Sequence, residues 1–165
     1  MQSQSISIGS STVRVGARKP VRPLTPKKSL YDRVGGRPTL ERVHKLLYDY
    51  VCTDQVLGQF FAGVERVRHE RQLTDFMSAA MGGPQTFIGK NPRDAHQHLY
   101  ITDEMFVHRH RLLARAIHTA GVPGPLLEEW LHVDSAFRRV TVKNGIKDCQ
   151  PQYTHGPIVV AKAVP

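Results

Sequence analysis

The chain has 165 residues and a mass of 18.6 kDa, which suits one domain and leaves no room for two of average size. Apolar residues make up 40% and charged residues 22%, so the chain is too apolar to be disordered and too charged for a membrane bundle. No window approaches the run of about 18 apolar residues that a transmembrane helix needs, so we expect no membrane span.

Residues 1–28 form a basic extension that contains no acidic residue, and the formal net charge of the whole chain is +9. The composition predicts a flexible segment. Two other interpretations stay open, an organelle transit peptide and a contact with an acidic surface. No aromatic residue is interleaved with the basic ones, so nucleic-acid binding is not expected.

Helical spacing recurs between residues 29 and 142 and predicts an all-α domain. The first strong helix is expected at residues 38–52. Its apolar face consists of Leu40, His44, Leu47, Tyr48 and Val51. A short apolar cluster that includes Phe60 and Phe61 follows, and Gly63 separates it from the next helix.

The second helix is expected at residues 64–80, where polar side chains share the apolar face. That face consists of His69, Gln72, Leu73, Phe76, Met77 and Ala80. A buried polar group without a partner costs about 1–3 kcal/mol, so His69 and Gln72 need partners. The alternative is that His69 sits at the edge of the face and reaches water.

The second half of the chain begins with a glycine-rich stop at residues 82–84. Asn91 and Pro92 have the pattern of a helix start, and the next cap, Thr102, leaves room for only about two turns around His96. A long helix then runs to Gly121, and a last helix extends to residue 140. Residues 143–165 are expected to form an irregular extension with a short extended piece at residues 158–160.

Most of the nine histidines do not fit a metal site. His108 and His110 belong to a basic run with Arg109 and Arg111, which we interpret as a solvated helix face. The sequence contains no His-Glu-x-x-His zinc motif, no Cys-x-x-Cys pair and no Gly-rich phosphate loop.

One combination of side chains remains, and it fits haem chemistry. His96 lies on a short helix, while His69 and Tyr48 face the core from two other helices. Haem iron needs one axial nitrogen on one side, and a polar group on the other side decides which gas binds.

Residues 30 to about 140 resemble a truncated haemoglobin, most closely the group I branch. The resemblance rests on the opening LYDRVGG, the Phe60-Phe61 pair, the turn AAMGGP at residues 79–84, the segment from Ala95-His96 to Thr102, and Gly121-Val122-Pro123. It implies a two-over-two helical sandwich around haem b in residues 29–142, with irregular extensions on both sides.

The resemblance also implies roles for individual residues. His96 takes the position of the proximal iron ligand, and Tyr48, His69 and Gln72 face the bound gas from the opposite side. Further haem contacts are expected from Phe61, Arg68, His69, Leu73, Phe76, Ile88 and Phe106, with Arg68 meeting a propionate.

The chain departs from the family pattern at Leu73, where group I members often carry a glutamine that helps to hold the ligand. Leu73 cannot donate a hydrogen bond, so we expect Tyr48 and His69 to form the hydrogen bonds to the bound gas, with Gln72 assisting. Alternatively, His69 itself ligates the iron opposite His96 and blocks the sixth site until a gas displaces it.

The expected function is reversible binding of dioxygen, nitric oxide and carbon monoxide, with oxidation of nitric oxide to nitrate as the leading chemistry. That chemistry needs a separate reductase, because no flavin or nicotinamide motif occurs in the sequence. The alternatives are a gas or redox sensor that acts through the extensions and a peroxidase-like activity. Cys52 and Cys149 favour a reducing compartment, the cytoplasm or, if residues 1–28 are a transit peptide, an organelle.

Overall fold

The computed structural model describes residues 27–162, so the predicted extension at residues 1–28 lies outside the described part except for its last two residues. The helical elements are α1 (Leu30–Arg33), α2 (Gly36–Thr53), η1 (Leu57–Phe61), α3 (Arg66–Ala80), α4 (Pro92–His96), α5 (Asp103–Thr119), α6 (Gly124–Ser135), α7 (Arg138–Thr141) and η2 (Ile146–Asp148). Two short strands, β1 (Leu99–Tyr100) and β2 (Val159–Val160), pair in parallel.

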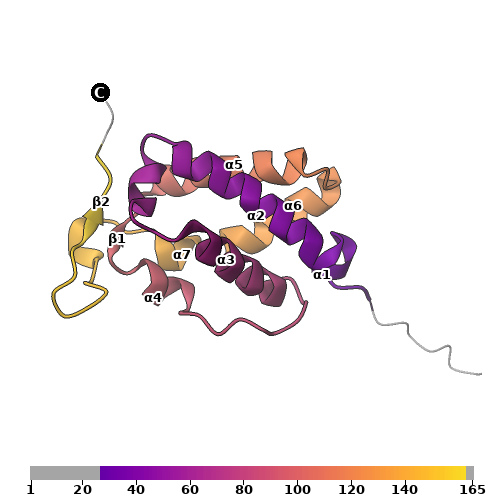
Figure 1. Cartoon of the computed structure of the whole chain (residues 1–165), viewed down its shortest axis with the longest axis horizontal. Coiled ribbons are helices and arrows are strands. Elements are labelled where there is room, and N and C mark those ends of the chain that lie inside the picture. The colour runs from indigo at the N-terminus through magenta and orange to yellow at the C-terminus, as the bar shows by residue number, and fades with distance from the viewer. Residues whose placement is uncertain (1–26, 163–165) are drawn as a thin grey trace, which may run out of the picture.

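Four helices form two crossed layers, and α2 is drawn across α5 in Figure 1. Helix α2 packs against both α3 and α5, and α5 packs against α6. The expectation of an all-α fold is therefore confirmed, and the layers are the pair α2 and α3 over the pair α5 and α6. The chain segment that carries α4 lies beside this body, in contact with α7.

The core is centred on α2, whose predicted face is confirmed. Every residue of that face is buried, and Leu40 and His44 are at most 1% exposed. Trp130 of α6 is fully buried, and its ring meets that of His44 edge-on at 5.9 Å between centroids. Residues spaced by three and four positions thus bring α2 onto α6 as well as onto α3 and α5.

The buried face of α3 differs from the one expected. The structure buries Thr74, Met77 and Ser78, whereas Ala80 is exposed. The reason is that small hydroxyl side chains fit close to α2, and Thr74 finds a hydrogen-bond partner there in His44. The apolar side chains alone predict a buried face that is rotated about the helix axis from the one in the structure.

The predicted helix boundaries between α3 and α6 are confirmed. Asn91 caps α4 by accepting a hydrogen bond from the amide of Asp94, and Thr102 caps α5 in the same way. Gly82 and Gly121 have φ values of +82° and +80° directly after α3 and α5, a conformation that glycine adopts without steric cost.

The single last helix predicted up to residue 140 is wrong. The chain leaves the helix after Ser135 and forms a separate turn, α7, from Arg138. Phe137 lies at the break, and its ring contacts that of Phe76 with 4.9 Å between centroids. Apolar spacing reports which side chains face inward, but it carries no signal for a change of helix direction.

The C-terminal segment contains the short extended piece that the sequence predicts. Val159 lies opposite Leu99 in the two-stranded pair, and Val160 lies opposite Tyr100. Within residues 27–162, no helix combines the length and the apolar character that a bilayer crossing requires.

Candidate functional site

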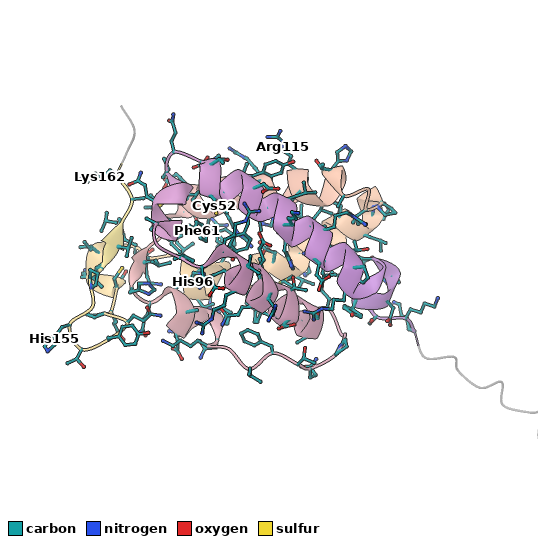
Figure 2. The ribbon with its side chains drawn as sticks, in the orientation of Figure 1. Cys52, Phe61, His96, Arg115, His155 and Lys162 are labelled. Atoms are coloured by element: carbon teal, nitrogen blue, oxygen red, sulfur yellow. The ribbon has the colours of Figure 1, made fainter. Side chains whose placement is uncertain are left out.

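The candidate site lies where α2 ends and α3 begins, beside α4. Figure 2 shows Phe61 of η1 and His96 of α4 at this same end of the helical body. Tyr48 of α2 meets the Phe61 ring edge-on, with 5.5 Å between centroids. Phe61, Leu73 and Phe76 are half-buried and pack against the core, so apolar surface from η1 and α3 borders the site.

His96 is neutral, and only one of its two ring nitrogens is engaged by the backbone. Its Nδ1 lies 2.7 Å from the carbonyl oxygen of Pro92, so Nδ1 carries the proton and donates it to that oxygen. Burial lowers the pKa of His96 against the opposing effect of this hydrogen bond, and the charge of Arg109 lowers it further. The ring therefore keeps a lone pair on Nε2, as a metal-binding imidazole requires.

Tyr48 provides a hydroxyl that stays protonated. Its side chain is buried, with 8% exposed, and burial raises its pKa to about 12. No side chain or backbone group of residues 27–162 forms a hydrogen bond with this hydroxyl. Its O–H is therefore available to a ligand.

His69 points its Nδ1 back along its own helix. Nδ1 lies 3.1 Å from the carbonyl oxygen of Glu65, and since a carbonyl oxygen only accepts, Nδ1 is the donor. The ring is half-buried, and the tautomer with its single proton on Nδ1 has a lone pair on Nε2. In this tautomer His69 can ligate a metal or accept a hydrogen bond, but it cannot donate one through Nε2.

The other expected contact residues divide into two groups. Gln72 is half-buried on α3, and Phe106 is buried on α5, where its ring stacks on that of His110. Arg68 is exposed at the start of α3. Ile88 does not join the site, because its side chain is 100% exposed and a fully exposed side chain contacts nothing.

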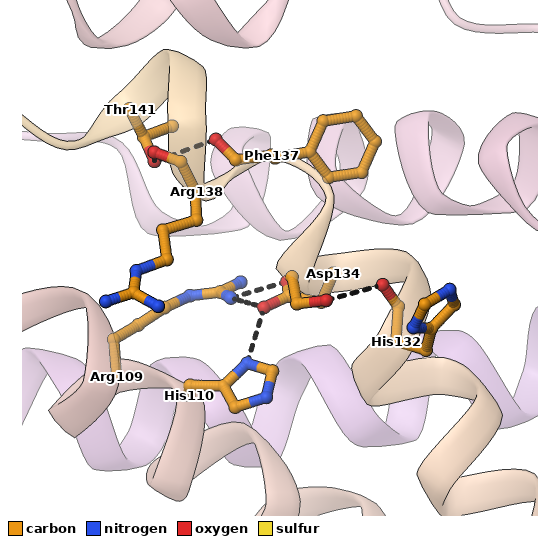
Figure 3. A network of polar contacts seen from close by, with 8 residues as sticks. Arg109, His110, His132, Asp134, Phe137, Arg138 and Thr141 are labelled. Atoms are coloured by element: carbon orange, nitrogen blue, oxygen red, sulfur yellow. Dashed lines mark hydrogen bonds and ion pairs between the residues drawn. The ribbon is translucent and has the colours of Figure 1, made fainter.

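A buried ion pair lies on the α5–α6 side of the molecule, as Figure 3 shows. Asp134 is 5% exposed, and its carboxylate accepts hydrogen bonds from Arg109 at 2.6 Å and from His110 at 3.0 Å. Burial acts to raise the pKa of Asp134, but the Arg109 charge and these hydrogen bonds lower it to about 2.

This network corrects the interpretation of the basic run as a solvated face. Arg109 and His110 are half-buried on Asp134, and His108 pairs with Asp54 at 2.6 Å. The reason is that His108, Arg109 and His110 each have a carboxylate partner elsewhere in the chain, which the pattern within one helix does not reveal; Arg111 of the same run is exposed, as expected. One signal was present, because Asp134 stands four residues after Trp130 on an apolar helix face.

The donors present fit haem better than a bare metal ion. Among residues 27–162 there is no group of three or more His, Cys, Asp or Glu side chains that could cage an ion. A porphyrin supplies four nitrogens of its own and needs one further nitrogen from the protein, which the free Nε2 of His96 would supply. The apolar side chains of Phe61 and Leu73 suit the rim of such a macrocycle.

Two crossed helix pairs with one such histidine on a short separate helix define a globin of the shortened, two-over-two kind. The model of the bacterial-like globin family matches residues 29–143. Group 1 truncated hemoglobin GlbN of Mycolicibacterium paratuberculosis is 37% identical over 103 residues, which cover 62% of this chain and 76% of the relative. The chain therefore belongs to the bacterial-like globin family and is a truncated haemoglobin of the group 1 type.

Solved structures agree with this assignment. The truncated hemoglobin of Tetrahymena pyriformis in its Fe(III) form has a TM-score of 0.67 at 25% identity, over 71% of this chain and all of the other. The 2/2 hemoglobin of Synechococcus sp. PCC 7002, solved in the cyanomet state with covalently attached heme, has a TM-score of 0.64 at 26% identity. This match covers 68% of this chain and 95% of the Synechococcus chain. Membership of this family implies a haem-binding globin that binds diatomic gases.

Proposed function

We propose that the protein holds haem b through Nε2 of His96, binds dioxygen reversibly and uses it to convert nitric oxide to nitrate. The observation that carries the proposal is the free Nε2 of a neutral His96, whose other nitrogen is engaged by Pro92. This arrangement fixes the tautomer and the ring orientation before the cofactor arrives.

Tyr48 is the residue that we expect to select and retain dioxygen. When bound, haem supplies the iron site for a diatomic gas and the redox chemistry that combines dioxygen with nitric oxide. The protonated Tyr48 hydroxyl donates to a gas molecule that has gained negative charge, and this slows its escape. Nitric oxide and carbon monoxide gain less from this donor.

His69 and Gln72 have secondary roles in this proposal. With Nδ1 donating to the Glu65 carbonyl, His69 presents the lone pair of Nε2, so it accepts a hydrogen bond from a water rather than donating to the gas. Gln72 carries an amide that can donate from the same helix. Arg68 is exposed near the start of α3 and meets a propionate at the edge of the macrocycle.

A separate reductase would complete the cycle, because the conversion of nitric oxide and dioxygen to nitrate consumes one electron, which haem would supply and the reductase would replace. The two cysteines of the described residues are both free thiols, which suits the reducing cytoplasm.

The visible spectrum of the haem-loaded protein is the first test. We expect one broad visible band after reduction with dithionite, the sign of five-coordinate ferrous iron with an open site. Two sharp bands that become one broad band in His69→Ala would overturn the open-site proposal and assign His69 as the sixth ligand. The absence of a Soret band would overturn the haem proposal itself.

Stopped-flow mixing of the oxygenated ferrous protein with nitric oxide tests the chemistry. We expect nitrate and ferric protein in equal amounts, formed faster than in a control without protein. A rate equal to the control would leave gas binding in place and remove dioxygenation as the function.

A further inference from the structure

The chain after the globin core folds back onto the segment that carries His96. We call residues 143–162 the strap; it contains η2 and β2. In Figure 2 the strap lies beside the same end of the body as His96 and Phe61, with Lys162 above and His155 below. The strap begins where the family model ends, at residue 143.

The strap contacts the chain on both sides of α4. After α4, the amide of Gln150 donates to the carbonyl of Gln97 at 2.8 Å, and that of Val159 donates to the carbonyl of His98 at 2.8 Å. The side chain of Gln97 donates in return to the carbonyl of Pro151 at 3.1 Å. Before α4, the ammonium of Lys90 lies 5.5 Å from the centre of the ring of Tyr153.

The far end of the strap is fixed to η1, the element that carries Phe61. The amide side chain of Gln59 accepts a hydrogen bond from the Lys162 amide at 2.8 Å and donates one to the Lys162 carbonyl at 3.0 Å. Ala161, which precedes Lys162, is 7% exposed. The strap thus connects the chain on either side of α4 with η1, so it contacts two separate parts of the candidate site.

Helix α4 cannot set its own orientation. It has five residues, and helices this short are not stable without tertiary contacts. Its neighbours along the chain are a loop and the two-residue strand β1, so the hydrogen bonds to the strap are the ordered contacts that flank His96. On the side of the helical body, α4 contacts the short helix α7.

We propose that the strap is a positioning element for the proximal histidine: its pairing with residues 97–101 fixes the distance and tilt of His96 toward the haem iron and slows haem loss. The inference rests on the proposed function, since it assigns His96 as the ligand. Val159 and Gln59 are the positioning residues, and they act through the backbone beside His96 and through η1.

A matched pair of proline variants in the full chain tests the strap. Val159→Pro removes the N–H that pairs with His98, whereas Val160→Pro removes an N–H on the opposite edge of the strand, because alternate groups point to opposite sides. We expect Val159→Pro to shift or broaden the iron–histidine stretching band in the resonance Raman spectrum of the ferrous protein. It should also speed haem loss to an excess of haem-free myoglobin roughly five- to tenfold. Val160→Pro should leave both as in the parent protein.

A second pair covers the other end of the strap. Gln59→Glu keeps the acceptor for the Lys162 amide but loses the donor to its carbonyl, and Gln55→Glu makes the same change of charge at an exposed position one turn earlier. Faster haem loss is expected only in Gln59→Glu. Parent-like haem loss and an unshifted iron–histidine band in both Val159→Pro and Gln59→Glu would overturn the proposal.

Hydrogen exchange in the haem-free protein separates failure of the strap from failure of the haem proposal. Val159→Pro should speed amide exchange at residues 97–101, and Val160→Pro should not, whether or not haem binds. Unchanged exchange in Val159→Pro would refute the strap. If the full chain shows no Soret band but does show this exchange difference, the assignment of His96 as the haem ligand is refuted and the contact between the strap and residues 97–101 stands.

Discussion

Nδ1 of His44 lies 2.8 Å from Oγ1 of Thr74, and both side chains are 1% exposed. The bond joins α2 to α3 at the centre of the core. Burial, with a smaller contribution from the charge of Arg109, lowers the pKa of His44 to about 3. A histidine in this position stays neutral while the molecule is folded.

Stability should therefore fall in mild acid. The unfolded chain takes up a proton on residue 44 below its ordinary pKa of about 6.5, whereas the folded chain does not until about pH 3. His44 alone should lower the free energy of unfolding by about 2 kcal/mol between pH 7 and pH 5. Urea denaturation at both pH values measures it. His44→Gln should lose this part of the slope and the exposed His132→Gln should keep it; equal slopes in the parent and His44→Gln would contradict the assignment.

Replacing the carboxylate of Asp134 by an uncharged group should lower the free energy of unfolding. Asp134→Asn leaves the Arg109 charge half-buried without its carboxylate, and we expect a loss of about 3 kcal/mol in the free energy of unfolding. The double variant Arg109→Met with Asp134→Leu should lose less, because no charge then lacks a partner. Chemical denaturation of the three proteins checks this order. The contribution of Asp134 is present above its ordinary pKa near 4 and is lost as the pH falls to about 2.

His96→Ala should abolish tight haem binding, since the variant lacks the axial nitrogen. The Soret band after haem addition is the measurement, and added imidazole should restore part of it by filling the space of the missing ring. His98→Ala, two residues further on, serves as the control and should keep the parent spectrum. A parent-like spectrum of His96→Ala would remove His96 from the ligand role.

Tyr48→Phe should release dioxygen faster, by about tenfold for one lost hydrogen bond. Flash photolysis or rapid mixing gives the dissociation rate, and the rate for carbon monoxide should change much less. Tyr50→Phe is the control on the same helix, because the Tyr50 ring packs under Arg115 on another face. If both variants release dioxygen at the parent rate, the Tyr48 hydroxyl does not act on the gas.

The main helices were predictable because their signals are local. Three- and four-residue spacing marks the buried side of α2, and capping residues such as Asn91 and Thr102 mark where helices begin. The burial of Thr74 and Ser78 was not predicted, because both side chains count as polar on a hydropathy scale. Thr74 is buried with a hydrogen-bond partner, and Ser78 is small enough to pack close to the neighbouring helix.

The features that the sequence did not reveal depend on contacts between distant residues. The partner of Arg109 stands 25 positions further along the chain, and that of Gln59 stands 103 positions further. The two residues of β2 favour a strand, but their sequence does not predict that β1 is the strand with which they pair. For the candidate site, spacing brought Tyr48 and His96 into one hypothesis, while the exposed position of Ile88 depends on a loop that has no periodicity.

The strap also has a consequence for how the molecule assembles. Its contact between Gln59 and Lys162 closes a loop of 103 residues, and the entropy lost on closing a loop grows with its length. Such a contact is made after the local helices have formed and docked. We therefore expect the strap to form after the helices that it joins, so that the chain around His96 is held least firmly until the Gln59–Lys162 contact has closed.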